Sequence, residues 1–133
     1  MGRCDMYRVL IIDDDASFGG RAVRCLERGG FAARFHQGPF GSLHAIRETG
    51  SDIVLVDIDM PRLDGGLLVK MVRDAYGLGQ TRVMLVGNRP DQQLAELAST
   101  VGADGYVSKH LAEPDLVNRV RSMANVRAGS APN

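Results

Sequence analysis

Short apolar runs alternate with longer amphipathic stretches along the chain. The three strongest runs hold four consecutive apolar residues each, without the apolar–polar alternation of a half-exposed strand. Such runs are typical of strands that are buried on both faces of a sheet. Two weaker strands are expected after the Gly29–Gly30 pair and after Gly102. The five expected strands cover residues 9–12, 31–36, 53–56, 83–86 and 105–108.

Helical periodicity fills the segments between these strands. Leu94, Leu97, Ala98 and Val101 recur at i, i+3, i+4 and i+7, which places them on one face of a helix. A further helix is expected over residues 39–49. Three other stripes are formed by Phe18, Ala22, Cys25 and Leu26, by Leu67, Leu68, Met71, Val72 and Ala75, and by Leu116, Val120 and Met123.

Residues that begin and end helices stand beside these stripes. Asp15 or Ser17 is expected to cap the first helix, because a short polar side chain accepts hydrogen bonds from the first free N–H groups. Gly29 is placed to end that helix, and Pro114 suits the first turn of the last one.

Strands and helices that alternate five times predict an α/β fold. We expect a single five-stranded parallel sheet with helices on both faces. In such sheets the chemistry lies at the carboxyl ends of the strands. One domain is expected over residues 7–125, followed by a flexible tail or linker over 126–133, where Gly, Ser, Ala and Pro gather.

Composition narrows the classes of function. Lys and Arg total 16 and Asp and Glu total 16 in 133 residues, so the basic excess of a dedicated nucleic-acid binder is missing. Cys4 and Cys25 do not form a C-x-x-C pair, and we interpret them as reduced thiols. No apolar stretch reaches the length of a membrane span. We therefore expect a cytoplasmic protein without a membrane segment.

Acidic residues and one lysine follow three of the expected strands. Asp13 and Asp14 follow the first, Asp57 the third, and Lys109 the fifth. The carboxyl ends of parallel strands share one edge, so we expect these side chains to meet. Clustered carboxylates repel each other unless a cation compensates, and Mg²⁺ is a natural partner because it prefers oxygen ligands. A metal, a lysine and an aspartate nucleophile together suit phosphoryl transfer.

The segments V-L-I-I-D-D-D (9–15), D-I-V-L-V-D-I-D-M-P-R-L-D-G (52–65) and G-A-D-G-Y-V-S-K (102–109) carry a family resemblance. Together they closely resemble the receiver domains of two-component response regulators, over nearly the whole chain. The resemblance implies a flavodoxin-like (βα)5 fold with strand order 2-1-3-4-5. It also implies a signalling protein that accepts phosphate rather than a turnover enzyme.

The resemblance assigns roles to individual residues. Asp57 matches the phosphoacceptor and Lys109 the lysine that contacts the phosphoryl group. Asp13 and Asp14 match the acidic pair that organises Mg²⁺, with Asp14 as the direct ligand and Asp13 acting largely through water. Asp57 would also bind the metal, and the backbone carbonyl of Asp59 would complete its shell.

The sequence departs from the family pattern at the switch positions. Gly87 stands where the family has Ser or Thr, so the hydroxyl that reaches the phosphoryl group is missing. Asn88 follows where a small residue is usual, and Tyr106 matches the aromatic residue whose rotamer reports activation. His110 replaces a proline that is usually cis, and a trans peptide is expected because a cis bond before a non-proline residue costs roughly 3 kcal/mol.

Two charged residues match variable positions at the pocket mouth. Asp59 and Arg89 carry opposite charges, and we expect them to form an ion pair that screens attacking water. With His110 they would form the rim of the pocket.

Partners follow from the resemblance. The phosphoryl donor would be a histidine kinase or a histidine phosphotransfer protein. A downstream protein would bind the fourth helix, fifth strand and fifth helix, and no direct binding of nucleic acid or membrane is expected. The sequence leaves open whether the chain is a stand-alone regulator or a receiver cut from a larger protein. The residues expected on this output surface are Gln92, Gln93, Glu96, Tyr106, Arg119 and Arg121.

Two other functions remain open. Gly87 and His110 would suit a pseudo-receiver, a binding module that acts without phosphorylation. Asp57-x-Asp59 also resembles the nucleophile motif of haloacid-dehalogenase-like phosphatases. Pro61 breaks the usual continuation of that motif, and the motif follows the third strand instead of the first.

Overall fold

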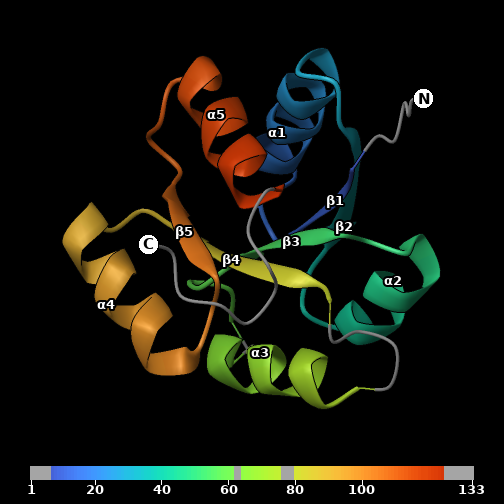
Figure 1. Cartoon of the computed structure of the whole chain (residues 1–133), viewed down its shortest axis with the longest axis vertical. Coiled ribbons are helices and arrows are strands. Elements are labelled where there is room, and N and C mark those ends of the chain that lie inside the picture. The colour runs from blue at the N-terminus through green and yellow to red at the C-terminus, as the bar shows by residue number, and fades with distance from the viewer. Residues whose placement is uncertain (1–6, 62–63, 76–79, 125–133) are drawn as a thin grey trace.

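A five-stranded parallel sheet forms the centre of the protein (Figure 1). The computed structural model describes residues 7–61, 64–75 and 80–124. The strand order is β2-β1-β3-β4-β5, as the family resemblance implies. The strands are β1 (Arg8–Asp13), β2 (Ala32–Gln37), β3 (Ile53–Asp57), β4 (Arg82–Gly87) and β5 (Gly105–Ser108).

Helices cover both faces of this sheet. One face packs on the first and last helices, and the other packs on the three between them (Figure 1). The sequence prediction of five alternating strands and helices is therefore confirmed. The helices are α1 (Ala16–Arg28), α2 (Ser42–Thr49), α3 (Gly65–Asp74), α4 (Asp91–Val101) and α5 (Glu113–Ala124).

The apolar runs of the strands contribute side chains to two hydrophobic cores, one on each face of the sheet. Val9 and Ile11 point into the core beneath α1 and α5, whereas Leu10 and Ile12 point to the opposite face. All four side chains are at most 1% exposed. Successive side chains of a strand point to opposite faces, so a strand covered on both sides has to be apolar at every position.

Capping fixes the start of α1 and α3. The Asp15 carboxylate accepts hydrogen bonds from the N–H groups of Ser17 and Phe18, so Asp15 is the cap of the predicted pair. Asp64 accepts from the N–H of Leu67 in the same way. Gly29 follows the last residue of α1 as predicted, but the left-handed residue is the next one, Gly30, with φ of 97°.

Three sequence predictions need correction. The second helix begins at Ser42 rather than near Pro39, because Gly41 has φ of 78° and cannot belong to a right-handed helix. The second strand runs one residue later than predicted, over Ala32–Gln37. The stripe predicted for α3 is wrong at Leu67 and Met71, which are 53% and 41% exposed.

The buried face of α3 is set by its packing against the sheet. Leu68, Val69 and Val72 are buried there, so the helix is rotated relative to the predicted stripe. Leu67 and Met71 lie with Phe40 around a surface pocket between α2 and α3. Among the described residues, no helix is both long enough and apolar enough to cross a bilayer. The tail predicted at 126–133 and Cys4 lie outside the described residues.

Candidate functional site

Two aspartates end neighbouring strands at the carboxyl edge of the sheet. Asp13 closes β1 and Asp57 closes β3, and the two strands pair directly. Their carboxyl groups are almost fully buried, at 0% and 3% exposure. Asp13 Oδ1 accepts a hydrogen bond from the N–H of Asp15, and Asp57 Oδ1 accepts one from the N–H of Asp59. Each carboxylate therefore has one oxygen fixed by its own loop and a second oxygen that points to the shared site.

Lys109 reaches this site from the end of β5. Its backbone N–H donates to the carbonyl of Gly87, which fixes the start of the side chain beside β4. The ammonium lies 2.7 Å from Asp13 Oδ2 and 3.3 Å from Asp57 Oδ2. Three of the four residues that the sequence predicted to converge meet in this contact, and one cation bridges two carboxylates.

Burial and charge shift the pKa values of these groups. Burial raises the pKa of Asp57 to about 6, and the nearby Asp13 adds to this effect. The N–H of Asp59 and the Lys109 ammonium act in the opposite direction. Burial by itself would lower the pKa of Lys109, but the contacts with Asp13 and Asp57 outweigh it and raise that pKa. The lysine is therefore charged, and Asp57 is ionised at neutral pH.

The acidic cluster has the chemistry of a divalent-cation site. Asp13, Asp14 and Asp57 each offer a carboxylate oxygen, and these oxygens lie within 4.8 Å of one another. Asp13 Oδ2 is buried, and its close neighbour is the Lys109 ammonium, 2.7 Å away. A buried carboxylate oxygen beside two further carboxylates fits Mg²⁺, which prefers oxygen ligands. Asp14 is exposed, so water can reach the same ion.

The predicted ion pair stands at the pocket mouth. Arg89 Nη2 lies 2.9 Å from Asp59 Oδ1, and both side chains remain partly exposed. The side chain of Asp59 thus binds Arg89, while the metal-binding role of its carbonyl stays a prediction. His110 and Asn88 are exposed. The peptide bond between Lys109 and His110 is trans, as predicted.

Gly87 is tightly enclosed. A Cβ atom at this position would lie 2.9 Å from Ile58 Cγ1 and 3.2 Å from Leu94 Cδ2. These distances are shorter than ordinary carbon contacts. The space that a Ser or Thr side chain would need is therefore filled by Ile58 and Leu94. Sequence reasoning found the missing hydroxyl but not the residues that replace it.

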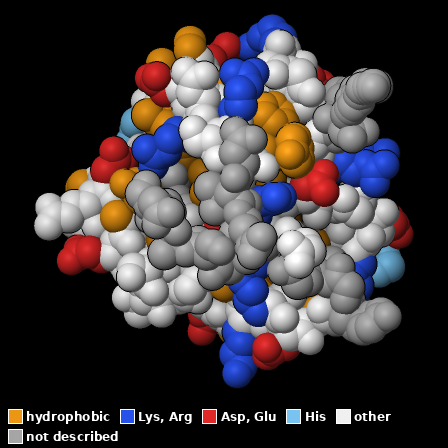
Figure 2. All heavy atoms as spheres, viewed as in Figure 1, with side chains coloured by type: hydrophobic (Ala, Val, Ile, Leu, Met, Phe, Trp, Pro, Cys, Tyr) orange, Lys and Arg blue, Asp and Glu red, His pale blue; other side chains and the backbone are white. Residues whose placement is uncertain are grey.

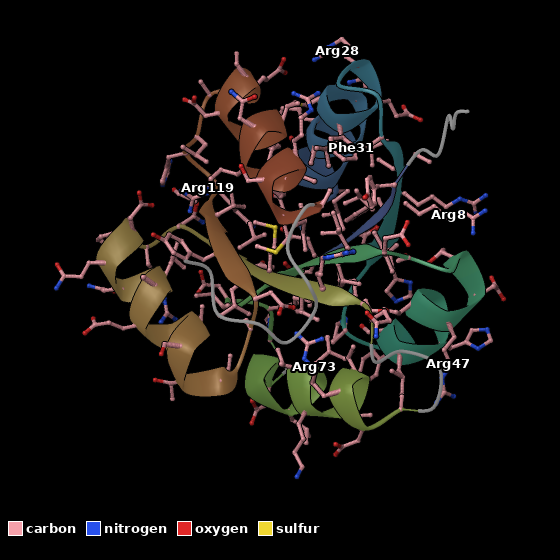
Figure 3. All side chains as sticks on the ribbon, in the orientation of Figure 1. Arg8, Arg28, Phe31, Arg47, Arg73 and Arg119 are labelled. Carbon is pink, nitrogen blue, oxygen red and sulfur yellow. The ribbon has the colours of Figure 1, made fainter. Side chains whose placement is uncertain are left out.

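Tyr106 is held by an arginine of α5. The guanidinium of Arg119 lies 4.7 Å from the centre of the Tyr106 ring and donates a 2.8 Å hydrogen bond to the Tyr106 carbonyl. Arg119 lies beside β5 in Figure 3. Arg121, predicted on the same output surface, instead donates to the carbonyl of Gly29 after α1. The predicted output set therefore does not share one face.

Phe18 is a member of the site that sequence reasoning assigned only to the core. Its ring lies beneath the Lys109 ammonium, with 4.8 Å between Nζ and the ring centre. The available signal was its place in the first turn of the helix that follows Asp13–Asp15. Such a residue faces back toward the strand end.

Comparison with known proteins agrees with this geometry. A model of the response regulator receiver domain matches residues 9–121. The transcriptional regulatory protein CseB of Streptomyces coelicolor is 32% identical over 119 residues, which cover 90% of this chain and 50% of CseB. The DNA-binding response regulator MtrA of Mycobacterium bovis is 30% identical over 115 residues, covering 86% of this chain and 49% of MtrA. The chain spans about half the length of these curated relatives.

A solved structure shows the same fold. The chemotaxis response regulator CheY4 of Vibrio cholerae superposes with a TM-score of 0.79 at 21% identity, over 89% of this chain and 98% of CheY4. The strand order and the family match favour neither the phosphatase nor the pseudo-receiver prediction.

Proposed function

We propose that this chain, which belongs to the family of response regulator receiver domains, accepts a phosphoryl group on Asp57 from a histidine kinase or phosphotransfer protein. One observation carries the proposal: a buried lysine bridges two buried carboxylates at the strand ends, and the exposed carboxylate of Asp14 lies beside them. The family acts in two-component signalling, and its receiver domains signal rather than turn over a substrate.

The chemistry assigned to Asp57 is nucleophilic. A carboxylate oxygen of Asp57 forms a bond to phosphorus while the phosphorus–nitrogen bond of a donor phosphohistidine breaks and its electron pair returns to the imidazole. Oδ2 is the oxygen suited to attack, because Oδ1 is held by the N–H of Asp59. Lys109 lies 3.3 Å from Oδ2 and can neutralise one charge of the incoming group.

Mg²⁺ is the proposed cofactor. Asp13, Asp14 and Asp57 would hold the ion, with the carbonyl of Asp59 as a further ligand. When bound, it would supply positive charge against the developing charge on the phosphoryl oxygens. The buried carboxylate of Asp13 then has two cationic neighbours in place of one.

The protein is proposed to act in the cytoplasm and to signal by direct contact with another protein. The downstream partner would bind α4, β5 and α5, where Gln92, Gln93 and Glu96 are exposed. The visible face in Figure 2 carries Lys and Arg side chains interspersed with Asp and Glu, which does not favour direct binding of nucleic acid by this chain. Gly87 provides no hydroxyl, so this family member would use a non-standard readout.

Labelling with acetyl phosphate and Mg²⁺ tests the proposal. Intact-mass spectrometry is expected to show one added phosphoryl group on the wild type and none on Asp57→Asn. Asp74→Asn is the matched control, because Asp74 is an exposed aspartate on α3. A label that persists in Asp57→Asn, or no label from either acetyl phosphate or a kinase, would contradict the assignment.

A phosphorylation-independent interaction module is the second candidate, favoured by the filled space beside Gly87. A beryllofluoride-treated amide spectrum distinguishes the two functions. Shifts that extend into α4 indicate a domain that responds to the phosphoryl mimic. Shifts confined to residues near Asp14 and Asp57 favour the interaction module.

A further inference from the structure

The Lys109 ammonium contacts two carboxylates and one aromatic ring. Asp13 and Asp57 contact it on the carboxylate side, and the face of the Phe18 ring lies 4.8 Å away. The lysine side chain is only 10% exposed, so little water solvates the charge. A cation over an aromatic face is attracted by the ring quadrupole, and more so when it is desolvated.

Phe18 is held firmly where it meets the lysine. Its N–H donates to the Asp15 cap in the first turn of α1, and its side chain is 7% exposed. The next residue, Gly19, lets α1 approach the sheet closely, since a Cβ there would overlap the Phe35 ring. The ring is thus fixed by both the cap and the helix packing.

The two carboxylates are contacts that the proposed reaction alters. Mg²⁺ would share the charge of Asp13, and phosphorylation would convert Asp57 Oδ2 into the bridging oxygen of an acyl phosphate. Either event changes the carboxylate contacts that hold the ammonium before the reaction. The Phe18 ring is uncharged and is neither a metal ligand nor phosphorylated, so neither event alters it chemically.

We propose that Phe18 is a positioning residue that holds the Lys109 ammonium against the reacting oxygen of Asp57 while the carboxylate partners change. The proposal rests on the proposed function. A positioning role can be distinguished from a packing role. An aliphatic side chain fills the same apolar space but offers no negative aromatic face to the Lys109 ammonium.

An aromatic-to-aliphatic series at position 18 tests the difference. Phe18→Leu and Phe18→Met keep an apolar side chain, and Phe18→Tyr keeps the ring face. We expect the rate of acetyl phosphate labelling and the affinity for beryllofluoride to fall about three- to thirtyfold in the Leu and Met variants, the range of a desolvated cation–π contact. Phe18→Tyr should recover most of the loss. Equal losses in all three variants would overturn the proposal.

A double-mutant cycle with Lys109 distinguishes an effect of Phe18 on the position of the ammonium from an effect on folding. In a Lys109→Ala background there is no ammonium to hold, so Phe18→Leu should change the labelling rate by less than about twofold. The same fold-loss with and without Lys109 would show that Phe18 acts only on the structure. The thermal unfolding midpoint of each variant is measured together with its labelling rate, so that a loss of folding is recognised.

One measurement requires no phosphorylation. In wild-type protein the ε-methylene protons of Lys109 should be shifted upfield by the ring current of Phe18, and Phe18→Leu should remove that shift. A wild type with Asp57-dependent labelling but no ring-current shift overturns the role of Phe18 and leaves the proposed function intact. A wild type that is never labelled overturns the proposed function, and the role of Phe18 with it.

Discussion

At the scale of single residues, Asp57 is subject to two opposing requirements. Its carboxyl group is buried, which favours the neutral form, but it has to be ionised to act as a nucleophile. Burial raises its pKa to about 6, while the N–H of Asp59 and the ammonium of Lys109 keep it from rising further. These opposing effects leave the carboxylate ionised at neutral pH but weakly stabilised. A bound cation would favour the ionised form.

The titration of Asp57 is the first prediction. Without metal, its carboxyl ¹³C signal should titrate with a midpoint near the pKa of about 6, and saturating Mg²⁺ should move the midpoint to lower pH. Because this pKa lies above the ordinary value of 3.8 for an aspartate, the folded state binds the proton more tightly than the unfolded chain. The contribution of Asp57 to stability is therefore largest below pH of about 4 and falls as pH rises to about 6. A midpoint that Mg²⁺ leaves unchanged would argue against a metal at this carboxylate.

Arg89 carries the second prediction, at the pocket mouth. Its ion pair with Asp59 is partly exposed, so its removal should shorten the half-life of the phosphoryl group on Asp57 only about two- to fivefold. Loss of radiolabel from Arg89→Ala measures the effect. Arg47→Ala removes an exposed arginine from α2 (Figure 3) and should leave the half-life unchanged. Equal half-lives in wild type and Arg89→Ala would refute the screening role.

At the scale of elements, the junction of β4 with α4 is closed by apolar packing. Gly87 ends β4, and its φ does not lie in the left-handed region, so glycine is required there by space rather than by conformation. Ile58 follows β3 and Leu94 belongs to α4. Apolar side chains thus connect the loops after β3 and β4 with helix α4, at a place where the family has a hydroxyl group.

This packing gives the third prediction. Gly87→Thr should lower the free energy of unfolding by about 1–3 kcal/mol, because the added atoms overlap Ile58. In Gly87→Thr/Ile58→Ala the two losses should be less than additive by about 1 kcal/mol or more, since one change makes room for the other. Denaturant unfolding measures both.

Gly20→Ala is the control for adding a side chain to a glycine. A Cβ there meets only the end of the flexible Arg24 side chain, at 3.4 Å, and helix propensity favours alanine. Gly20→Ala should therefore be neutral or stabilising, while Gly87→Ala destabilises. If Gly87→Ala is as stable as wild type, the junction has more room than these distances indicate.

At the scale of the whole molecule, a polar network closes the edge of the sheet opposite the acidic site. Arg73 of α3 donates to the carbonyl of Thr81 and forms an ion pair with Asp104, which also accepts from the N–H of Val83. Asp104 is almost fully buried. Arg73 lies between α3 and the sheet in Figure 3. The network ties a helix to the amino ends of two strands.

Removing Arg73 is the fourth prediction. Arg73→Ala removes one cation from the buried Asp104 carboxylate and should lower the free energy of unfolding by about 2–4 kcal/mol. Lys70→Ala on the same helix removes an exposed cation from a 4.0 Å pair and should change stability by no more than about 0.5 kcal/mol. Chemical denaturation compares them, and losses of similar size would show that the burial of Asp104 is unimportant.

The sequence was sufficient for the sheet, because strands buried on both faces have to be apolar at every position. It was also sufficient for the meeting of Asp13, Asp57 and Lys109, because parallel strands bring their carboxyl ends to one edge. Both features depend on chain topology, which the apolar pattern encodes. The ion pair of Asp59 with Arg89 was predicted from the family resemblance instead.

Only the tertiary structure decided which side chains fill the space around that edge. Leu67 and Met71 lie outside the core, and Ile58 and Leu94 occupy the place of a switch side chain. The Phe18 ring lies beneath Lys109. Each result depends on how far a helix is rotated and how closely it approaches the sheet. Those quantities are set jointly by side chains distant in sequence, so no local pattern contains them.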